Sequence, residues 1–68
     1  MEYKEMFVKV ETFARLRGRL ITSVISAPRG ISYERYLEID RSLVRAFGNE
    51  NSRTIGTFAD NRKMALIG

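Results

Sequence analysis

The stretch Ser32 to Phe47, SYERYLEIDRSLVRAF, is the segment of the chain with the clearest helical period, and the rest of the fold can be placed relative to it. At about 100° per residue, its apolar side chains fall on one broad half of a cylinder and its charged side chains on the other. The apolar half consists of Tyr33, Tyr36, Leu37, Ile39, Leu43, Val44, Ala46 and Phe47. The sequence therefore predicts one long amphipathic helix over about residues 32–47.

Signals at both ends of this segment agree with a helix. Ser32 offers a side-chain oxygen for the N-cap, and Gly48 suits the backbone conformation that ends a helix. Glu34 lies near the positive end of the helix dipole and Arg45 near the negative end. The N-cap residue, the terminating glycine and the order of the charged residues thus predict the same helix boundaries.

One charged residue interrupts the apolar half of the helix. Asp40 falls between Tyr36 and Val44, where an unpaired carboxylate would be costly. In one interpretation, an Arg or a backbone N–H satisfies the carboxylate inside the fold, because buried charges are normally paired. In the other, the apolar arc is wider than a small sheet can cover, and its uncovered part, with Asp40 in it, meets another protein. The periodicity leaves both interpretations open.

Two strands are predicted before the helix. Residues 5–13 alternate, with Met6, Val8 and Val10 on the apolar side and with Phe7 and Phe13 on the polar side. Residues 20–27, LITSVISA, are rich in β-branched side chains. The glycine-containing segment 14–19 between them suits a tight reversal, so the two strands should form an antiparallel hairpin. Pro28, Arg29 and Gly30 are then expected to end the second strand.

The segments after the helix predict one or two more strands. Residues 54–59, TIGTFA, read as a third strand, and residues 62–67, RKMALI, as a short fourth one. Residues 60–68 form either this extra strand or a frayed tail. The predicted order is β-β-α-β(-β), which is a single α+β domain over residues 1–68 with an antiparallel sheet and the helix packed on one face.

The length and composition of the chain restrict the functions that it can have. A chain of 68 residues buries only about 60% of its unfolded surface, so we expect a marginally stable monomer or a weak homo-oligomer. The sequence has no Cys and no His, which excludes disulfides, thiolate and imidazole metal ligands, and imidazole catalysis. We expect no cofactor and no metal site. The apolar runs are too short for a membrane span and the N-terminus is unlike a signal peptide, so we expect a cytoplasmic protein without a membrane partner.

Catalysis is not expected either. Tyr and Glu side chains can move protons, and Arg can stabilise a developing phosphorane, so Tyr33, Tyr36 and their charged neighbours could in principle cleave a phosphate ester. However, Glu34, Arg35 and Glu38 lie on the polar side of the helix, where charged i,i+4 neighbours are ordinary. The chain is also too short for a second layer that would form a pocket. We therefore predict that the protein is not an enzyme.

A cluster of Arg residues suggests an alternative binding function. Arg15, Arg17 and Arg19 lie around the predicted hairpin turn, and the 12 Lys and Arg against 8 Asp and Glu give a net charge of +4. Arg side chains match phosphate oxygens, so this tip could belong to a small basic nucleic-acid-binding module. No aromatic residue lies between them to stack on bases, and a charged turn also keeps a hairpin soluble. Nucleic-acid binding is thus the alternative and not the main expectation.

The helix resembles that of a known family. The segment from Tyr36 to Phe47, YLEIDRSLVRAF, is similar to the helix of the Dmd antitoxins of T-even bacteriophages. In that family a Tyr, a Glu, a Val or Ile, a Lys or Arg and a Leu-Val-Lys/Arg-Ala-Phe ending occupy the same register. The clear match covers about a dozen residues, and the order strand, strand, helix, strand agrees over most of the chain. Residues 60–68 have no clear counterpart.

The resemblance implies a phage protein that binds a host ribonuclease toxin and blocks its RNA cleavage, as part of a toxin–antitoxin, anti-defence interaction in the cytoplasm of the infected bacterium. It implies toxin contacts around the start of the helix and at one polar residue in mid-helix, which correspond here to Ile31 and Asp40. We expect Tyr33 and Tyr36 to join them in the toxin-binding site. The family carries a large aromatic residue where this chain has Ile31 and an Asn where it has Asp40, so which toxin is bound is left open.

Overall fold

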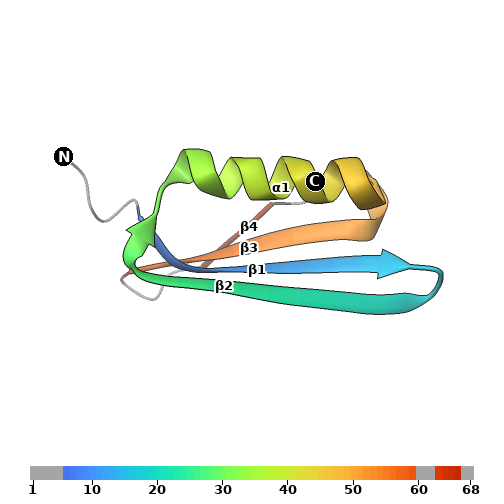
Figure 1. Ribbon diagram of the computed structural model, residues 1–68, viewed down its shortest axis with the longest axis horizontal. Coiled ribbons are helices and arrows are strands. Elements are labelled where there is room, and N and C mark those ends of the chain that lie inside the picture. Colours follow the sequence, from blue (N-terminus) through green and yellow to red (C-terminus); the bar gives the residue numbers. More distant parts are fainter. Residues whose placement is uncertain (1–5, 60–62, 67–68) are drawn as a thin grey trace.

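The computed structural model describes residues 6–59 and 63–66 and confirms the expected α+β fold (Figure 1). Along the chain come β1 (Phe7–Leu16), β2 (Arg19–Ile31), α1 (Tyr33–Phe47), the short 3₁₀ helix η2 (Asn49–Asn51), β3 (Ser52–Phe58) and β4 (Lys63–Leu66). The strands form one antiparallel sheet in the order β2-β1-β3-β4. The helix α1 packs on one face of this sheet, against β1 and β3.

The helix has the predicted boundaries and caps. The backbone N–H of Arg35 donates to the Ser32 hydroxyl oxygen at 3.1 Å, so Ser32 is the N-cap. The chain leaves the helix at Gly48, whose φ of 93° is a value that residues with a side chain rarely adopt. The N–H of Gly48 donates to the Val44 carbonyl at 2.7 Å. The helix therefore ends where the sequence indicated.

The hairpin of β1 and β2 is longer than predicted. Its loop is only Arg17 and Gly18, with Leu16 paired to Arg19. Both loop residues have positive φ, 53° and 80°, which is the geometry of a type I′ turn that matches the twist of the flanking strands. The two strands therefore continue through the segment expected to be a longer turn, and the hairpin extends past the end of the helix (Figure 1).

A register shift in β1 corrects the predicted alternation. The pairing of β1 with both neighbours is irregular between Phe7 and Lys9. This irregularity lets Phe7 and Val10, which a regular strand would place on opposite faces, both lie in the core with no exposed surface. The prediction that Phe7 lies on the polar side was therefore wrong.

The second and third strands also differ from the prediction, since β3 spans Ser52–Phe58 and not residues 54–59. The strand β2 does not end at Pro28 but resumes pairing with β1 at Ile31, opposite Phe7. Pro is tolerated there because β2 is an edge strand and the pairing is already irregular. The fourth strand is present over Lys63–Leu66. Arg62 and Ile67, the ends predicted for it, lie outside the described residues.

An aromatic cluster joins the helix to the sheet. The ring of Phe7 stacks on Tyr36 and on Phe58, with centroids 4.5 Å apart in both pairs. Tyr33 lies further out, at 6.4 Å from Phe7 and 6.1 Å from Tyr36. Gly56 on β3 lies beneath these rings, where a Cβ would collide with Phe7 and approach Tyr36 to 2.9 Å. The core can close only because this position has no side chain.

This close approach makes Gly56→Ala a test of the packing. We expect the substitution to lower the free energy of unfolding by about 1–3 kcal/mol, because the added methyl group displaces an aromatic ring in a filled core. Chemical denaturation followed by circular dichroism would measure the loss. Combining Gly56→Ala with Phe7→Leu should give a smaller loss than the sum of the two single losses, since the smaller side chain makes room for the methyl group. Strict additivity would contradict the proposed contact.

Candidate protein-binding surface

The four residues predicted to contact a toxin lie mostly in the interior. Tyr36 has no exposed surface, Ile31 is 5% exposed and Asp40 is 9% exposed, while Tyr33 is 47% exposed. Ile31 and Tyr36 belong to the core cluster with Phe7 and Val10. Of the four, Tyr33 alone presents a large side chain to solvent in this structure.

Asp40 has a partner inside the fold. The hydroxyl of Thr54 on β3 donates to the Asp40 Oδ1 atom at 2.8 Å, and Thr54 itself has no exposed surface. A buried polar pair of this kind satisfies both groups. Of the two sequence interpretations, the structure therefore corresponds to a carboxylate paired within the fold, although the partner is a Thr hydroxyl and not an Arg or a backbone N–H.

Tyr36 adds a second bond to the same strand. Its hydroxyl donates to the Thr54 carbonyl oxygen at 3.0 Å and lies 3.4 Å from the Met64 carbonyl oxygen. Burial raises the pKa of the Tyr36 phenol above its ordinary value of 10.0, and the negative charge of Asp40 raises it further. Tyr36 and Asp40 thus hold the helix to β3 through one residue, Thr54.

The opposite flank of the helix is left uncovered by the sheet. Because α1 packs on β1 and β3, a groove remains between the helix and the outer strand β2. Its walls are formed by helix residues and by residues of β1 and β2: Thr12, Ser23, Ile25, Arg35, Glu38, Ile39, Ser42, Leu43, Ala46 and Phe47. Ile39, Leu43 and Phe47 are half-buried here, and Ala46 is exposed. The apolar arc of the helix is therefore wider than its contact with the sheet.

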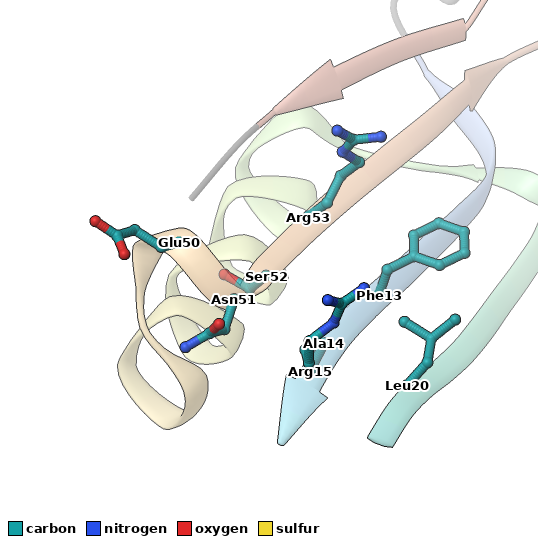
Figure 2. A pocket seen from close by; sticks show the side chains of 8 residues that line it. All are labelled: Phe13, Ala14, Arg15, Leu20, Glu50, Asn51, Ser52 and Arg53. Carbon is teal, nitrogen blue, oxygen red and sulfur yellow. The ribbon is translucent and has the colours of Figure 1, made fainter. Parts of the chain in front are cut away.

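The face of the sheet away from the helix is also open. Figure 2 shows Phe13, Leu20 and Arg53 projecting from three neighbouring strands, with Arg15 beside them. They border a shallow depression that continues to the loop residues Glu50 and Asn51. Two of the predicted nucleic-acid-binding residues, Arg17 and Arg19, lie nearby at the exposed hairpin tip. The sequence pattern did not indicate that Arg53 would join Arg15, since only the pairing of β1 with β3 brings them to one face.

Metal-ligand clusters and membrane-spanning helices are absent from the described residues. Across residues 6–59 and 63–66, no three His, Cys, Asp or Glu side chains are grouped so as to hold a metal ion. In the same residues, no helix is long and apolar enough to cross a membrane. On the exposed surface of the helix, Arg35 pairs with Glu38 at 3.1 Å.

Comparison with known proteins finds no matching family model, no similar curated protein and no similar solved structure.

Removing the Asp40 carboxylate should destabilise the fold. Asp40→Ala leaves the buried Thr54 hydroxyl without its acceptor, so we expect the free energy of unfolding to fall by about 1–3 kcal/mol. Asp40→Asn keeps an oxygen at the same position and is the matched control, with a clearly smaller loss expected. Urea denaturation of the three proteins would measure this order. Equal stability of Asp40→Ala and the wild type would show that the bond to Thr54 contributes nothing.

Alkaline pH should weaken the contribution of Tyr36. Because the pKa of Tyr36 is higher in the folded protein than its ordinary value of 10.0, the folded state holds the phenol proton more tightly than the unfolded chain. This stabilisation is complete below about pH 10 and is lost as the pH rises through the folded pKa. The stability difference between the wild type and Tyr36→Phe should therefore shrink above that pH. A difference that stays constant across the alkaline range would contradict this assignment.

Proposed function

We propose that the protein is a phage-encoded, antitoxin-like inhibitor that binds a host ribonuclease toxin and blocks its RNA cleavage through the uncovered part of its helix. The observation that carries the proposal is the groove between α1 and β2, where Ile39, Leu43 and Phe47 are covered only in part. A partly exposed apolar stripe on a helix is a common protein-binding surface. The likeness of residues 36–47 to the Dmd helix supplies the class of partner.

The buried residues have a different role in this proposal from the one the resemblance implied. Tyr36, Asp40 and Ile31 contribute by fixing the helix on the sheet, since the structure gives them partners within the fold. Tyr33, at the start of the helix and half exposed, remains a candidate for direct contact. The toxin would thus meet Tyr33 and the groove flank of the helix.

The charge of the protein restricts how the inhibitor could work. With a net charge of +4, the protein does not imitate RNA by overall charge. Inhibition must therefore come from occupying or distorting the toxin with an apolar surface, assisted by local acidic groups such as Glu38 at the edge of the groove.

Co-expression with a panel of host ribonuclease toxins tests the proposal. We expect the wild-type protein to restore growth and to co-purify with at least one toxin. Ala46→Glu, which adds a charge at an exposed position of the groove, should weaken that complex by about tenfold or more while leaving the thermal midpoint nearly unchanged. Arg41→Glu is the control, because Arg41 is exposed and does not line the groove, so its larger charge change should matter less.

Nucleic-acid binding by the open sheet face is the competing function, favoured by the position of Arg15 and Arg53 around Phe13 (Figure 2). Binding to phosphates weakens steeply with salt, by a log–log slope of about −0.7 to −0.9 per neutralised phosphate, whereas an apolar contact does not. We expect little retention of single-stranded RNA at physiological salt. Tight, strongly salt-dependent RNA binding that Arg53→Glu abolishes and Ala46→Glu preserves would replace the inhibitor proposal.

A further inference from the structure

The two edges of the sheet are protected very differently. At one edge, β4 (Lys63–Leu66) is short and begins with an exposed Lys, which are two usual ways of preventing edge pairing. At the other edge, β2 runs over Arg19–Ile31 and, within the described residues, pairs only with β1. From residue 20 to residue 27 it carries no charged side chain and no Pro. This part of the edge has none of the features that keep a strand from pairing.

The side chains of this edge are apolar on both faces of the sheet. Leu20 and Val24, on the face away from the helix, are 65% and 56% exposed, and Ile21 and Ile25, on the helix side, are 44% and 39% exposed. Exposure of four large apolar side chains on one strand of a small domain marks an interaction surface. An extended strand is the occupant that fits this edge, because it can bond to the row of outer backbone groups of β2.

The hairpin geometry defines which backbone groups point outward. In the two-residue turn, the N–H of Arg19 is directed to Leu16 on β1. The side towards which the backbone N–H and C=O groups point alternates from one residue to the next along a strand. Pairing with β1 is regular from Arg19 to Ser26. The odd-numbered residues therefore bond to β1, and the N–H and C=O groups of Leu20, Thr22, Val24 and Ser26 face outward.

We propose that this edge pairs with β2 of a second copy of the chain, antiparallel, about a two-fold axis at Ser23. In this register Thr22 lies opposite Val24 of the second copy and Ile21 lies opposite Ile25, so the pairs near the axis match β-branched side chains. The outward-facing residues form the hydrogen-bonded pairs, each exchanging two bonds. The result is a continuous eight-stranded antiparallel sheet, twice the four strands of one copy, with both helices on the same face.

Charge selects this register and favours a second copy as the occupant. Sliding the copies by one residue pair so that Val24 opposes itself would place Arg19 opposite Arg29, with like charges in contact. Sliding them the other way would place Arg19 against Ile25 and Ile21 against Ser23. With Ser23 on the axis, pairing ends at Arg19 opposite Ala27. An uncharged, β-branched strand is what this edge requires, and the chain itself supplies one in a self-complementary arrangement.

The mass of the protein in solution tests the dimer directly. Analytical ultracentrifugation should show a concentration-dependent shift from the 7.8 kDa monomer towards twice that mass. Val24→Lys should raise the dimer dissociation constant by about tenfold or more. Each copy adds one Lys to the dimer interface, and a Lys on an edge strand is a common means by which proteins prevent strand pairing. Circular dichroism should show an unchanged fold, since Val24 is exposed in the monomer. A wild-type protein that stays monomeric at millimolar concentration would overturn the proposal.

Cross-linking tests the register and uses the absence of native Cys. Ser23→Cys places two thiols opposite each other at a non-hydrogen-bonded pair, where Cα atoms are about 4.5 Å apart and within the range of a disulfide. Mild oxidation should therefore yield a disulfide-linked dimer rapidly. Ser42→Cys, on the exposed helix, is the matched control and should cross-link much more slowly. Equal rates for the two variants would contradict pairing at β2.

The edge proposal is independent of toxin inhibition and can fail separately. Val24 points away from the helix and does not line the groove, so Val24→Lys should leave toxin binding in place while weakening the dimer. Ala46→Glu should weaken toxin binding and leave the dimer in place. If Val24→Lys dimerises as tightly as the wild type, the edge interface is refuted whatever the outcome with the toxin.

Discussion

Tyr36 determines where the helix lies on the sheet. Its ring stacks on Phe7 of β1 and its hydroxyl bonds to the Thr54 carbonyl of β3, while Asp40, one turn further along, accepts the Thr54 hydroxyl. These contacts place the helix over the two central strands of a four-stranded sheet. A single helix is about 10 Å wide and two neighbouring strands span a similar width, so one helix cannot cover all four strands.

The surfaces with functional potential follow from that position. The helix does not cover the part of β2 that carries Ile21 and Ile25, so these side chains on the helix side of the sheet stay partly exposed. The helix flank that faces β2 is exposed for the same reason, and the groove forms between the two. The far face of the sheet has no covering layer in the described residues, which leaves Phe13 and Leu20 to border the depression with Arg15 and Arg53. The small size of the domain thus leaves these surfaces open.

The fold was largely predictable from local patterns. The period of residues 32–47, the Ser32 cap and Gly48 define the helix, and β-branched runs define the strands. The inward position of Phe7 was not predictable, because it depends on the space above Gly56 on a strand distant in sequence. The extension of β2 past Pro28 likewise depends on β2 being an edge strand, which is a property of the sheet and not of the residues around the proline.

The candidate site shows the limit of a helical wheel. The wheel correctly singled out Asp40 as unusual and the apolar arc as wide, but it could not tell which part of the arc the sheet would cover. That depends on the lateral position of the helix, which is set by the contacts of Tyr36 with Phe7 and Thr54. As a result, the centre of the arc, with Tyr36 and Asp40, belongs to the interior, and the uncovered part lies at Ile39, Leu43 and Phe47.

The groove and the edge of β2 share a strand but use different parts of it. The groove is lined by odd-numbered side chains, Ser23 and Ile25, which face the helix. Edge pairing instead uses the backbone groups of even-numbered residues, which face outward in the plane of the sheet. In the proposed dimer, Ile21 of one copy lies beside Ile25 of the other, so the apolar floor of each groove continues across the two-fold axis into its counterpart. The two helices then lie on the same face of the joined sheet, each beside its own groove. Dimerisation through the backbone of β2 therefore leaves the groove of each copy open for the toxin.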